Sequence, residues 1–305
     1  MSQLQMISGE GNFPEGIQRV IDLPNDALGA LWDSIIVDED IKSRLLLQAI
    51  LNFTIRGVVP RTVLPLHGIL MLTGLPGTGK TSLARGLAQR VNNSLPGGKF
   101  RLLEVEPHSL VSAAHGKTQR AVTDLFARSI AEAASVGHTV VLLDEVETLA
   151  ASRAKLSMDA NPIDVHRATD AALVQLDILA EEHPNLLFVA TSNFPQAIDQ
   201  AFLSRCDLVL EVPLPGVEAC ERILKDCLLG LSNTYPAIGD LAQARKIRNC
   251  AEACVGLDGR AIRKMVANAL ATDLQTAMDP EKITMEMLIT AANTARKTRA
   301  TGDNK

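Results

Sequence analysis

The sequence predicts an α/β protein, with a parallel sheet that carries helices on both faces and a small helical domain after it. Two observations predict this architecture. Short apolar runs alternate with stretches of helical periodicity over most of the chain, and only helical periodicity remains after Pro213. Such alternation indicates parallel strands, because a parallel strand needs a long crossover to reach its neighbour. The expected strands are Ile69–Thr73, Leu102–Val105, Thr139–Leu143, Leu186–Thr191 and Leu208–Val212.

The expected helices lie before the first strand, between the strands and throughout the region after the last strand. In the first part of the chain they cover 31–55, 80–92, 119–134 and 163–179. After the prolines at 213 and 215 they cover 217–231, 240–253, 260–276 and 284–296. We therefore predict three parts: a flexible arm over 1–30, a large α/β domain over 31–213 and a helical lid over 214–305.

The composition excludes several classes of function. The 305 residues carry a formal net charge of −5, which disfavours sequence-independent binding of nucleic acid, since that needs a basic surface. The N-terminus has no basic segment followed by an apolar one, so it does not resemble a secretory signal. The longest apolar stretches are too short to cross a bilayer. We expect a cytoplasmic protein without membrane contact.

A glycine-rich segment between an expected strand and an expected helix predicts a phosphate site. Residues 74–81 fit the pattern GxxxxGK[ST] in full. Glycines let several backbone N–H groups face one concavity, and the next helix adds the positive end of its dipole. Lys80 can reach the outer phosphates and Thr81 can hold Mg²⁺. The residues expected to bind ATP here are Gly74, Pro76, Gly77, Thr78, Gly79, Lys80, Thr81 and Ser82.

Two carboxylates follow the expected strand Thr139–Leu143. Asp144 and Glu145 would lie at the carboxyl edge of the sheet, where open parallel sheets bind their ligands. Asp144 is expected to bind the nucleotide-associated Mg²⁺, together with Thr81. Glu145 is the candidate for polarising the attacking water.

Three more side chains could complete a site for phosphoryl hydrolysis. Asn193 follows the strand Leu186–Thr191 and could position the water. Arg205 could stabilise transition-state charge on the nucleotide of a neighbouring subunit, which requires a ring. Arg260 begins a helix of the lid after an expected cap at Asp258, and could contact the γ-phosphate in its own subunit.

Together these elements resemble the AAA+ ATPases, and more closely the pachytene-checkpoint family, whose animal member is thyroid hormone receptor interactor thirteen. The resemblance covers Leu31 to about Arg296. The segments on which the resemblance rests are 31–35, 42–46, GLPGTGKTSLARGLAQ at 74–89, 107–110, VVLLDEVETLAASR at 140–153, ATSN at 190–193, 199–207 and GLDGRAIRKM at 256–265.

This resemblance implies a homohexameric ATPase that remodels HORMA-domain proteins, gripping the partner's N-terminal segment in the pore of the ring. It implies that Lys80 and Thr81 are the Walker A pair, that Asp144 and Glu145 are Walker B, and that Asn193 is sensor 1. It likewise makes Arg205 the arginine finger and Arg260 sensor 2. The segment of Ile35, Ile36 and Val37 would flank the adenine.

Two departures from the family pattern refine these expectations. Eukaryotic members have a folded N-terminal domain, whereas about 30 residues precede the expected motor here. The chain therefore resembles a compact bacterial form associated with cyclic-oligonucleotide antiphage systems (CBASS), where opening HORMA would switch off a cyclic-oligonucleotide synthase. The expected pore loop has no aromatic residue, and it is formed by Ala114, His115, Gly116 and Lys117.

Two other functions are weighed against this one. A DNA-directed AAA+ ATPase, of the clamp-loader or transposition-helper kind, is disfavoured by the negative charge. A scaffold that binds nucleotide without hydrolysing it is disfavoured by the complete set of Asp144, Glu145, Arg205 and Arg260.

Overall fold

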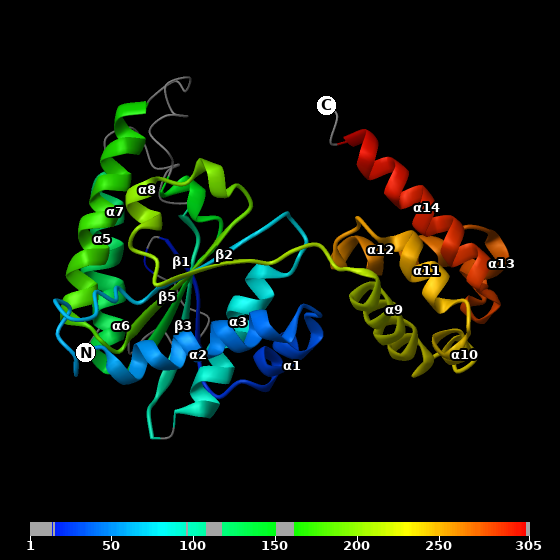
Figure 1. The fold of residues 1–305 in the computed structure, drawn as a ribbon, viewed down its shortest axis with the longest axis horizontal. Coiled ribbons are helices and arrows are strands. Elements are labelled where there is room, and N and C mark those ends of the chain that lie inside the picture. Colours follow the sequence, from blue (N-terminus) through cyan, green and yellow to red (C-terminus); the bar gives the residue numbers. More distant parts are fainter. Residues whose placement is uncertain (1–13, 15, 96, 108–117, 151–161, 303–305) are drawn as a thin grey trace. The chain divides into compact units, whose positions relative to one another are not determined.

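The structure is a computed structural model and describes residues 14, 16–95, 97–107, 118–150 and 162–302. The expected pore loop at 114–117 lies outside these residues. The chain forms two compact units (Figure 1). Unit 1 contains the described residues of Met1–Ser34, Glu39–Gly74 and Lys80–Glu211, and unit 2 contains Ile35–Asp38, Leu75–Gly79 and the described residues of Val212–Lys305.

Unit 1 is built on a six-stranded sheet in the order β1-β3-β4-β5-β2-β6. The strands β2 to β6 run parallel, and β1 pairs antiparallel with β3 at one edge. Their bounds are β1 Ile17–Asp22, β2 Ile69–Thr73, β3 Phe100–Val105, β4 His138–Leu143, β5 Leu186–Ser192 and β6 Leu208–Glu211. Every residue of β2 and β5 is buried, which explains why these strands read as continuous apolar runs.

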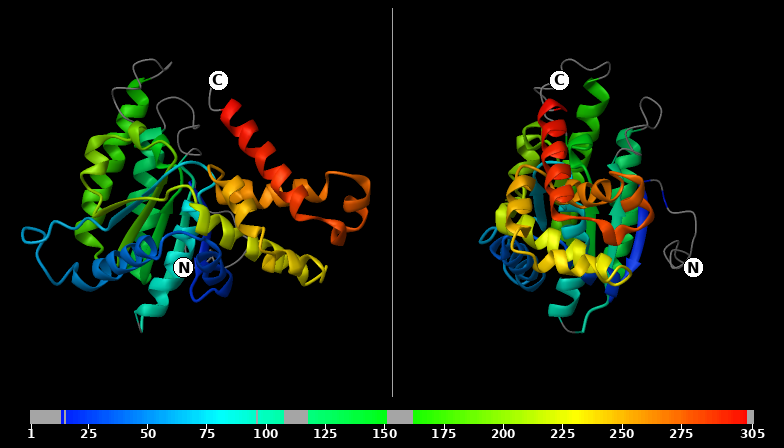
Figure 2. Two further views of the ribbon diagram at one scale, coloured as in Figure 1. Left: turned by 45° about the vertical axis from the view of Figure 1, so that its right-hand side comes forward. Right: turned by 90° about the vertical axis from the view of Figure 1, so that its right-hand side faces the viewer.

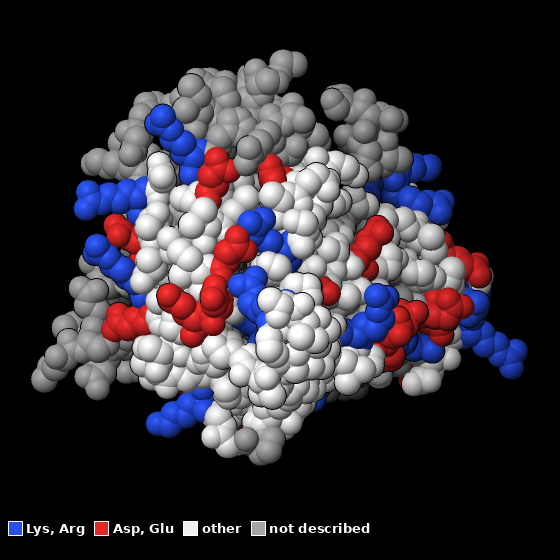
Figure 3. Space-filling view, turned by 60° about the vertical axis from the view of Figure 1, so that its left-hand side comes forward, with Lys and Arg blue, Asp and Glu red and all other residues white. Residues whose placement is uncertain are grey.

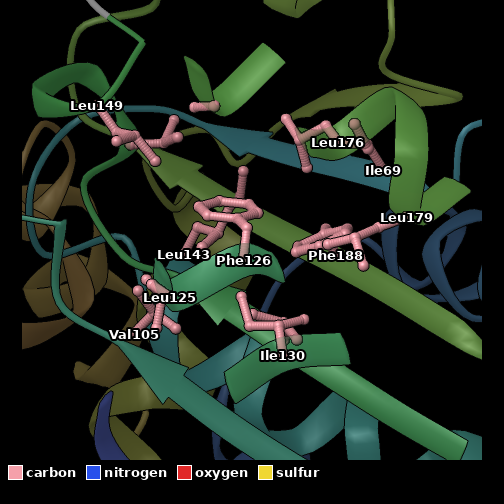
Figure 4. Packing of buried hydrophobic residues seen from close by; sticks show 14 of the residues in the cluster. Ile69, Val105, Leu125, Phe126, Ile130, Leu143, Leu149, Leu176, Leu179 and Phe188 are labelled. Carbon is pink, nitrogen blue, oxygen red and sulfur yellow. The ribbon is translucent and has the colours of Figure 1, made fainter. Parts of the chain in front are cut away.

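Helices cover both faces of this sheet, as predicted. One face carries α5, which continues through a π-helical segment (η2) into α6, together with α7. Its core is shown in Figure 4, where Phe126 of η2 stacks on Phe188 of β5 with ring centroids 5.9 Å apart. The bounds of these helices are α5 Thr118–Asp124, η2 Leu125–Ile130, α6 Ala131–Val136 and α7 Pro162–Glu182.

The other face of the sheet carries α2 and α3, and α1 packs on α3. Gly86 of α3 permits this packing. A Cβ at position 86 would lie 2.6–2.8 Å from the backbone and Cβ of Trp32 in α1, so only glycine fits. The bounds are α1 Asp26–Ser34, α2 Glu39–Ile55 and α3 Lys80–Ser94. Unit 1 also contains the short helices η3 Val146–Thr148, η5 Pro195–Ala197 and α8 Gln200–Leu203.

The N-terminal region departs from its prediction as a flexible arm over 1–30. Residues 17–22 form β1, and α1 begins at Asp26. The strand is held by backbone pairing with β3, an interaction between segments far apart in sequence that weak local periodicity does not reveal. The sheet is therefore mixed at this edge, although its other pairs are parallel as predicted. Between α1 and α2, residues 35–38 interrupt the expected helix over 31–55.

Unit 2 is helical after Val212, and its helices are coloured yellow to red in Figure 2. They are α9 Val217–Ser232, α10 Ile238–Gln243, α11 Ile247–Cys254, α12 Gly259–Leu270, α13 Leu274–Met278, the short η6 Pro280–Lys282 and α14 Met285–Gly302. The expected helix over 240–253 is two helices. The one expected over 260–276 ends at Leu270, because the Asp273 side chain accepts the N–H of Thr276 and caps a new helix. Among the described residues, no helix has both the length and the apolar character needed to cross a membrane.

Candidate functional site

The loop between β2 and α3 has the backbone of a phosphate cradle. Gly74, Gly77 and Gly79 adopt φ values of 142°, 83° and 97°, a region in which residues with side chains are strained. The N–H and the hydroxyl of Thr78 both donate to the carbonyl of Leu75, which closes the turn. The cradle then leads into the first turn of α3, where Lys80 and Thr81 are placed.

Lys80, Asn193 and Glu145 form a continuous chain of hydrogen bonds at the carboxyl edge of the sheet. The Lys80 ammonium donates to the Gly74 carbonyl and to Oδ1 of Asn193, both at 2.8 Å. Asn193 in turn donates through Nδ2 to Oε1 of Glu145 at 3.0 Å. Because β5 lies between β4 and β2, Asn193 stands between the strand that carries Glu145 and the strand that leads to Lys80. Asn193, the predicted sensor 1, is therefore hydrogen-bonded to both Lys80 and Glu145.

Asp144 and Thr81 meet in the arrangement expected for a magnesium site. The Thr81 hydroxyl donates to Oδ1 of Asp144 at 2.8 Å, and Thr191 donates to the same oxygen. A hydroxyl and a carboxylate are hard oxygen ligands of the kind that Mg²⁺ prefers beside nucleotide phosphates. The donor set therefore fits Mg²⁺, with Asp144 and Thr81 as the residues that would hold it.

Glu145 has a left-handed backbone, with φ 54° and ψ 55°. Apart from glycines, it is the only described residue with positive φ. Its N–H donates to the Thr191 hydroxyl at 3.1 Å, so a side chain of β5 stabilises this conformation. Strained backbone of this kind concentrates at functional sites, because the surrounding structure must maintain it. In this conformation the Glu145 carboxylate accepts the hydrogen bond from Nδ2 of Asn193.

Arg205 makes a bidentate ion pair within its own subunit. Its Nε and Nη2 donate to the two oxygens of Asp177 in α7 at 2.9 and 2.7 Å, and Nη1 donates to the carbonyl of Ala201 at 2.7 Å. The hydrogen bonds from Arg205 hold the pKa of Asp177 below its usual value, and Asp177 raises the pKa of Arg205.

The position of Arg205 separates it from the phosphate loop of its own subunit. The neighbouring Asp207 accepts the N–H groups of His67, Gly68 and Ile69, which places this segment at the start of β2. The phosphate loop begins at the other end of β2, five residues on. Five strand residues span roughly 16 Å. Arg205 therefore lies near the amino-terminal end of β2, whereas Lys80 lies beyond its carboxyl-terminal end.

Unit 2 contains the other predicted site residues, Ile35, Ile36, Val37 and Arg260. Ile35 packs against Gly79, because a Cβ there would come within 2.8 Å of Cδ1 of Ile35. Ile36 is buried in the helical core of unit 2, and Val37 is half-buried. Arg260 is exposed in the first turn of α12, which Asp258 caps by accepting the N–H of Ala261 at 2.9 Å. In the phosphate loop Pro76 is exposed, and Ser82 of α3 is half-buried.

Several contacts of the site escaped the sequence analysis. Thr191 joins Asp144 to the backbone of Glu145, and Glu147 accepts the N–H of Asn193 at 3.2 Å. Thr191 lies in the ATSN motif at 190–193, and Glu147 lies in the motif at 140–153. Their closeness in sequence to Asn193 and Glu145 was a signal that could have identified them. The sequence contains no comparable signal for Asp177, because only the fold brings Arg205, 28 residues away, into contact with it.

Comparison with known proteins agrees with this geometry. The family described as "ATPase family associated with various cellular activities (AAA)" matches residues 70–214. CD-NTase-associated protein 6 of Pseudomonas aeruginosa is 65% identical over 295 residues, 97% of each chain. A pachytene checkpoint protein 2 homolog of Arabidopsis thaliana is 33% identical and matches 88% of this chain, which spans 65% of that protein.

Solved structures show the same fold. Caenorhabditis elegans PCH-2 superposes with a TM-score of 0.72 at 25% identity, over 95% of this chain and 78% of that one. A chain from an Escherichia coli MS115-1 HORMA:CdnC:Trip13 complex superposes with a TM-score of 0.74 at 20% identity, over 94% and 97% of the two chains. The protein is therefore an AAA ATPase, and it belongs to the family of pachytene checkpoint protein 2 and CD-NTase-associated protein 6.

Proposed function

We propose that this ATPase works as a homohexameric ring that converts a HORMA-domain protein from its closed, partner-bound state to its open state. In doing so it would switch off a cyclic-oligonucleotide synthase of a bacterial antiphage system. The main observation in support of a ring is the position of Arg205 in the fold. An arginine at the far end of β2 from the phosphate loop can act on a phosphate only in a neighbouring copy.

In this proposal each residue around Asn193 has a separate role in ATP hydrolysis. Lys80 binds the outer phosphates, and Glu145 accepts a proton from the attacking water, which Asn193 holds beside it. When Mg²⁺ is bound, it neutralises charge on the phosphate oxygens. Thr81 and Asp144 present the oxygens that hold it. Arg205 of the next subunit stabilises the charge that develops on the transferred phosphoryl group.

The partner is inferred from the family and from the names of its members. The 65% identical relative is named for association with a CD-NTase, and a protein of the same fold was solved together with HORMA and CdnC. These names support a HORMA protein as the substrate and its synthase as the protein released. Residues 114–117, which carry His115 and Lys117, are the candidate grip on the N-terminal segment of the HORMA protein.

The charges of the molecule argue against a DNA-directed motor. The chain has a net charge of −5, and acidic and basic side chains are interspersed on the face in Figure 3. A DNA-binding surface instead gathers basic side chains along the phosphate backbone.

The decisive experiment mixes the protein with ATP and a complex assembled from a purified HORMA protein and a cyclic-oligonucleotide synthase. Wild type should release the synthase, as measured by size-exclusion chromatography and by loss of cyclic-oligonucleotide synthesis. Glu145→Gln keeps the shape of the side chain but loses the base, so it should bind the complex as a hexamer without releasing the synthase. Equal behaviour of wild type and Glu145→Gln would contradict the proposal.

A further inference from the structure

A carboxylate lies directly against the phosphate loop, inside unit 2. A Cβ built on Gly77 would come within 2.3 Å of Oδ1 and 2.4 Å of Cγ of Asp258. Gly77 has φ 83°, and its backbone is part of the cradle that faces the phosphates. The loop and the N-terminus of α12 therefore meet at the Asp258 side chain.

Such a carboxylate opposes phosphate binding unless its charge is compensated. A triphosphate carries several negative charges, and like charges a few ångströms apart repel strongly where water is partly excluded. Asp258 is only 13% exposed, so solvent screens it weakly. The N-terminus of α12 offsets part of the charge, because Asp258 accepts the N–H of Ala261 there.

The C-terminal helix supplies the remaining compensation. Nη1 of Arg299 in α14 donates to Oδ2 of Asp258 at 2.7 Å, and the Arg299 side chain is 24% exposed. The two oxygens of Asp258 thus have separate partners, one in α12 and one in α14. This side chain joins the phosphate loop to helices that begin about 180 and 210 residues further along the chain.

We infer that Arg299 is a positioning residue of the nucleotide site, which acts through Asp258. It cancels the charge that would otherwise stand beside Gly77, and it fixes the capped end of α12, whose first turn carries Arg260. The sequence motif GLDGR at 256–260 accounts for Asp258 and Arg260 but not for Arg299. This inference rests on the ATPase activity of the family and is independent of the proposed ring and partner.

The test measures the affinity of the full chain for ATP and ADP by titration calorimetry. Arg299→Ala should weaken ATP binding about tenfold, and ADP binding less, since ATP carries the additional γ-phosphate charge. The loss should shrink as salt is added, because removal of the Arg299 side chain leaves the Asp258 carboxylate more open to solvent and its charge is then screened. Arg299→Lys keeps the charge and should bind ATP within about threefold of wild type.

A second variant separates charge compensation from a purely structural role. Serine at 258 keeps the helix cap but removes the charge, so Asp258→Ser should make Arg299 dispensable. The double variant Asp258→Ser/Arg299→Ala should therefore bind ATP within about twofold of Asp258→Ser alone. Unchanged ATP affinity in Arg299→Ala would overturn the inference. It would also be overturned if the double variant lost as much affinity relative to Asp258→Ser as Arg299→Ala loses relative to wild type. Neither result would bear on HORMA release, which is measured separately.

Discussion

Asp177 binds Arg205 through both of its carboxylate oxygens, so the arginine expected to serve a neighbouring nucleotide is held in its own subunit. The same guanidinium also donates to the Ala201 carbonyl. These bonds use three of the five N–H groups of the guanidinium. Arg205 can therefore be held by Asp177 and still present N–H groups of Nη1 and Nη2 to a phosphate of a neighbouring subunit.

The first prediction concerns the subunit in which Arg205 acts. Arg205→Ala should lower hydrolysis by about a thousandfold while leaving ATP binding intact, because the arginine stabilises transition-state charge. Lys80→Ala should lose nucleotide binding. A mixture of these two inactive variants should regain activity in phosphate-release assays, since an Arg205→Ala subunit can bind ATP and a Lys80→Ala neighbour can supply the arginine. Mixed assemblies that stay inactive would place Arg205 in its own site.

The second prediction concerns the pH dependence of the Asp177–Arg205 pair. The hydrogen bonds from Arg205 lower the pKa of Asp177 from its usual 3.8. A depressed pKa in the folded state contributes stability above the unfolded value, and that stability is lost as pH falls through the folded pKa. Asp177→Asn should therefore be less stable than wild type at pH 7 in urea unfolding, and the difference should narrow below about pH 4. A difference independent of pH would contradict an ionic origin.

The third prediction tests Thr191 as the support of Asp144 and Glu145. Thr191→Val keeps the shape of the side chain but removes the hydroxyl that donates to Asp144 and accepts from the Glu145 backbone. We expect the rate of hydrolysis to fall about tenfold to a hundredfold, as when an outer-shell partner of a metal ligand is lost. The concentration of Mg²⁺ needed for half-maximal activity should rise in the same assay. Thr191→Ser is the matched control and should retain most of the activity.

The fourth prediction tests the close packing of α1 on α3. Gly86→Ala would force a Cβ to within 2.6–2.8 Å of Trp32, which should cost about 1–3 kcal/mol of stability. Gly230 in α9 is a suitable control, because no described atom outside its own stretch of helix lies within 4 Å of the Cβ it would gain. Gly230→Ala should be neutral or stabilising by up to about 1 kcal/mol, since alanine favours helix. Thermal unfolding should show a lower Tm for Gly86→Ala and an unchanged or higher Tm for Gly230→Ala. An unchanged Tm for Gly86→Ala would contradict the packing.

The elements that the sequence predicted well are those whose signal is local. The burial of β2 and β5 on both faces leaves continuous apolar runs, and the glycines of the phosphate loop are required by its backbone angles. Asp144, Glu145 and Asn193 follow such runs directly, so their shared edge could be inferred from parallel strands. The sheet places β5, which Asn193 follows, between β4 and β2.

The elements that the sequence missed depend on contacts between distant segments. β1 exists because its backbone pairs with β3, and Asp177 matters because the fold brings Arg205 to it. The break after Leu270 has a local signal, since Asp273 caps the next helix, but the apolar spacing continues through it. Periodicity thus identifies which face of a segment is buried, while caps decide where helices begin and end.

Trp32, the only tryptophan of the chain, gives the protein an intrinsic fluorophore at a useful place. Trp32 is 7% exposed and its ring lies beneath the Lys42 ammonium at 5.7 Å. Its backbone abuts Gly86 of the helix that starts with Lys80. A shift of α3 on filling the phosphate cradle would change the surroundings of this single emitter. The protein's own emission would then report occupancy of the cradle, without a modified nucleotide or an attached dye.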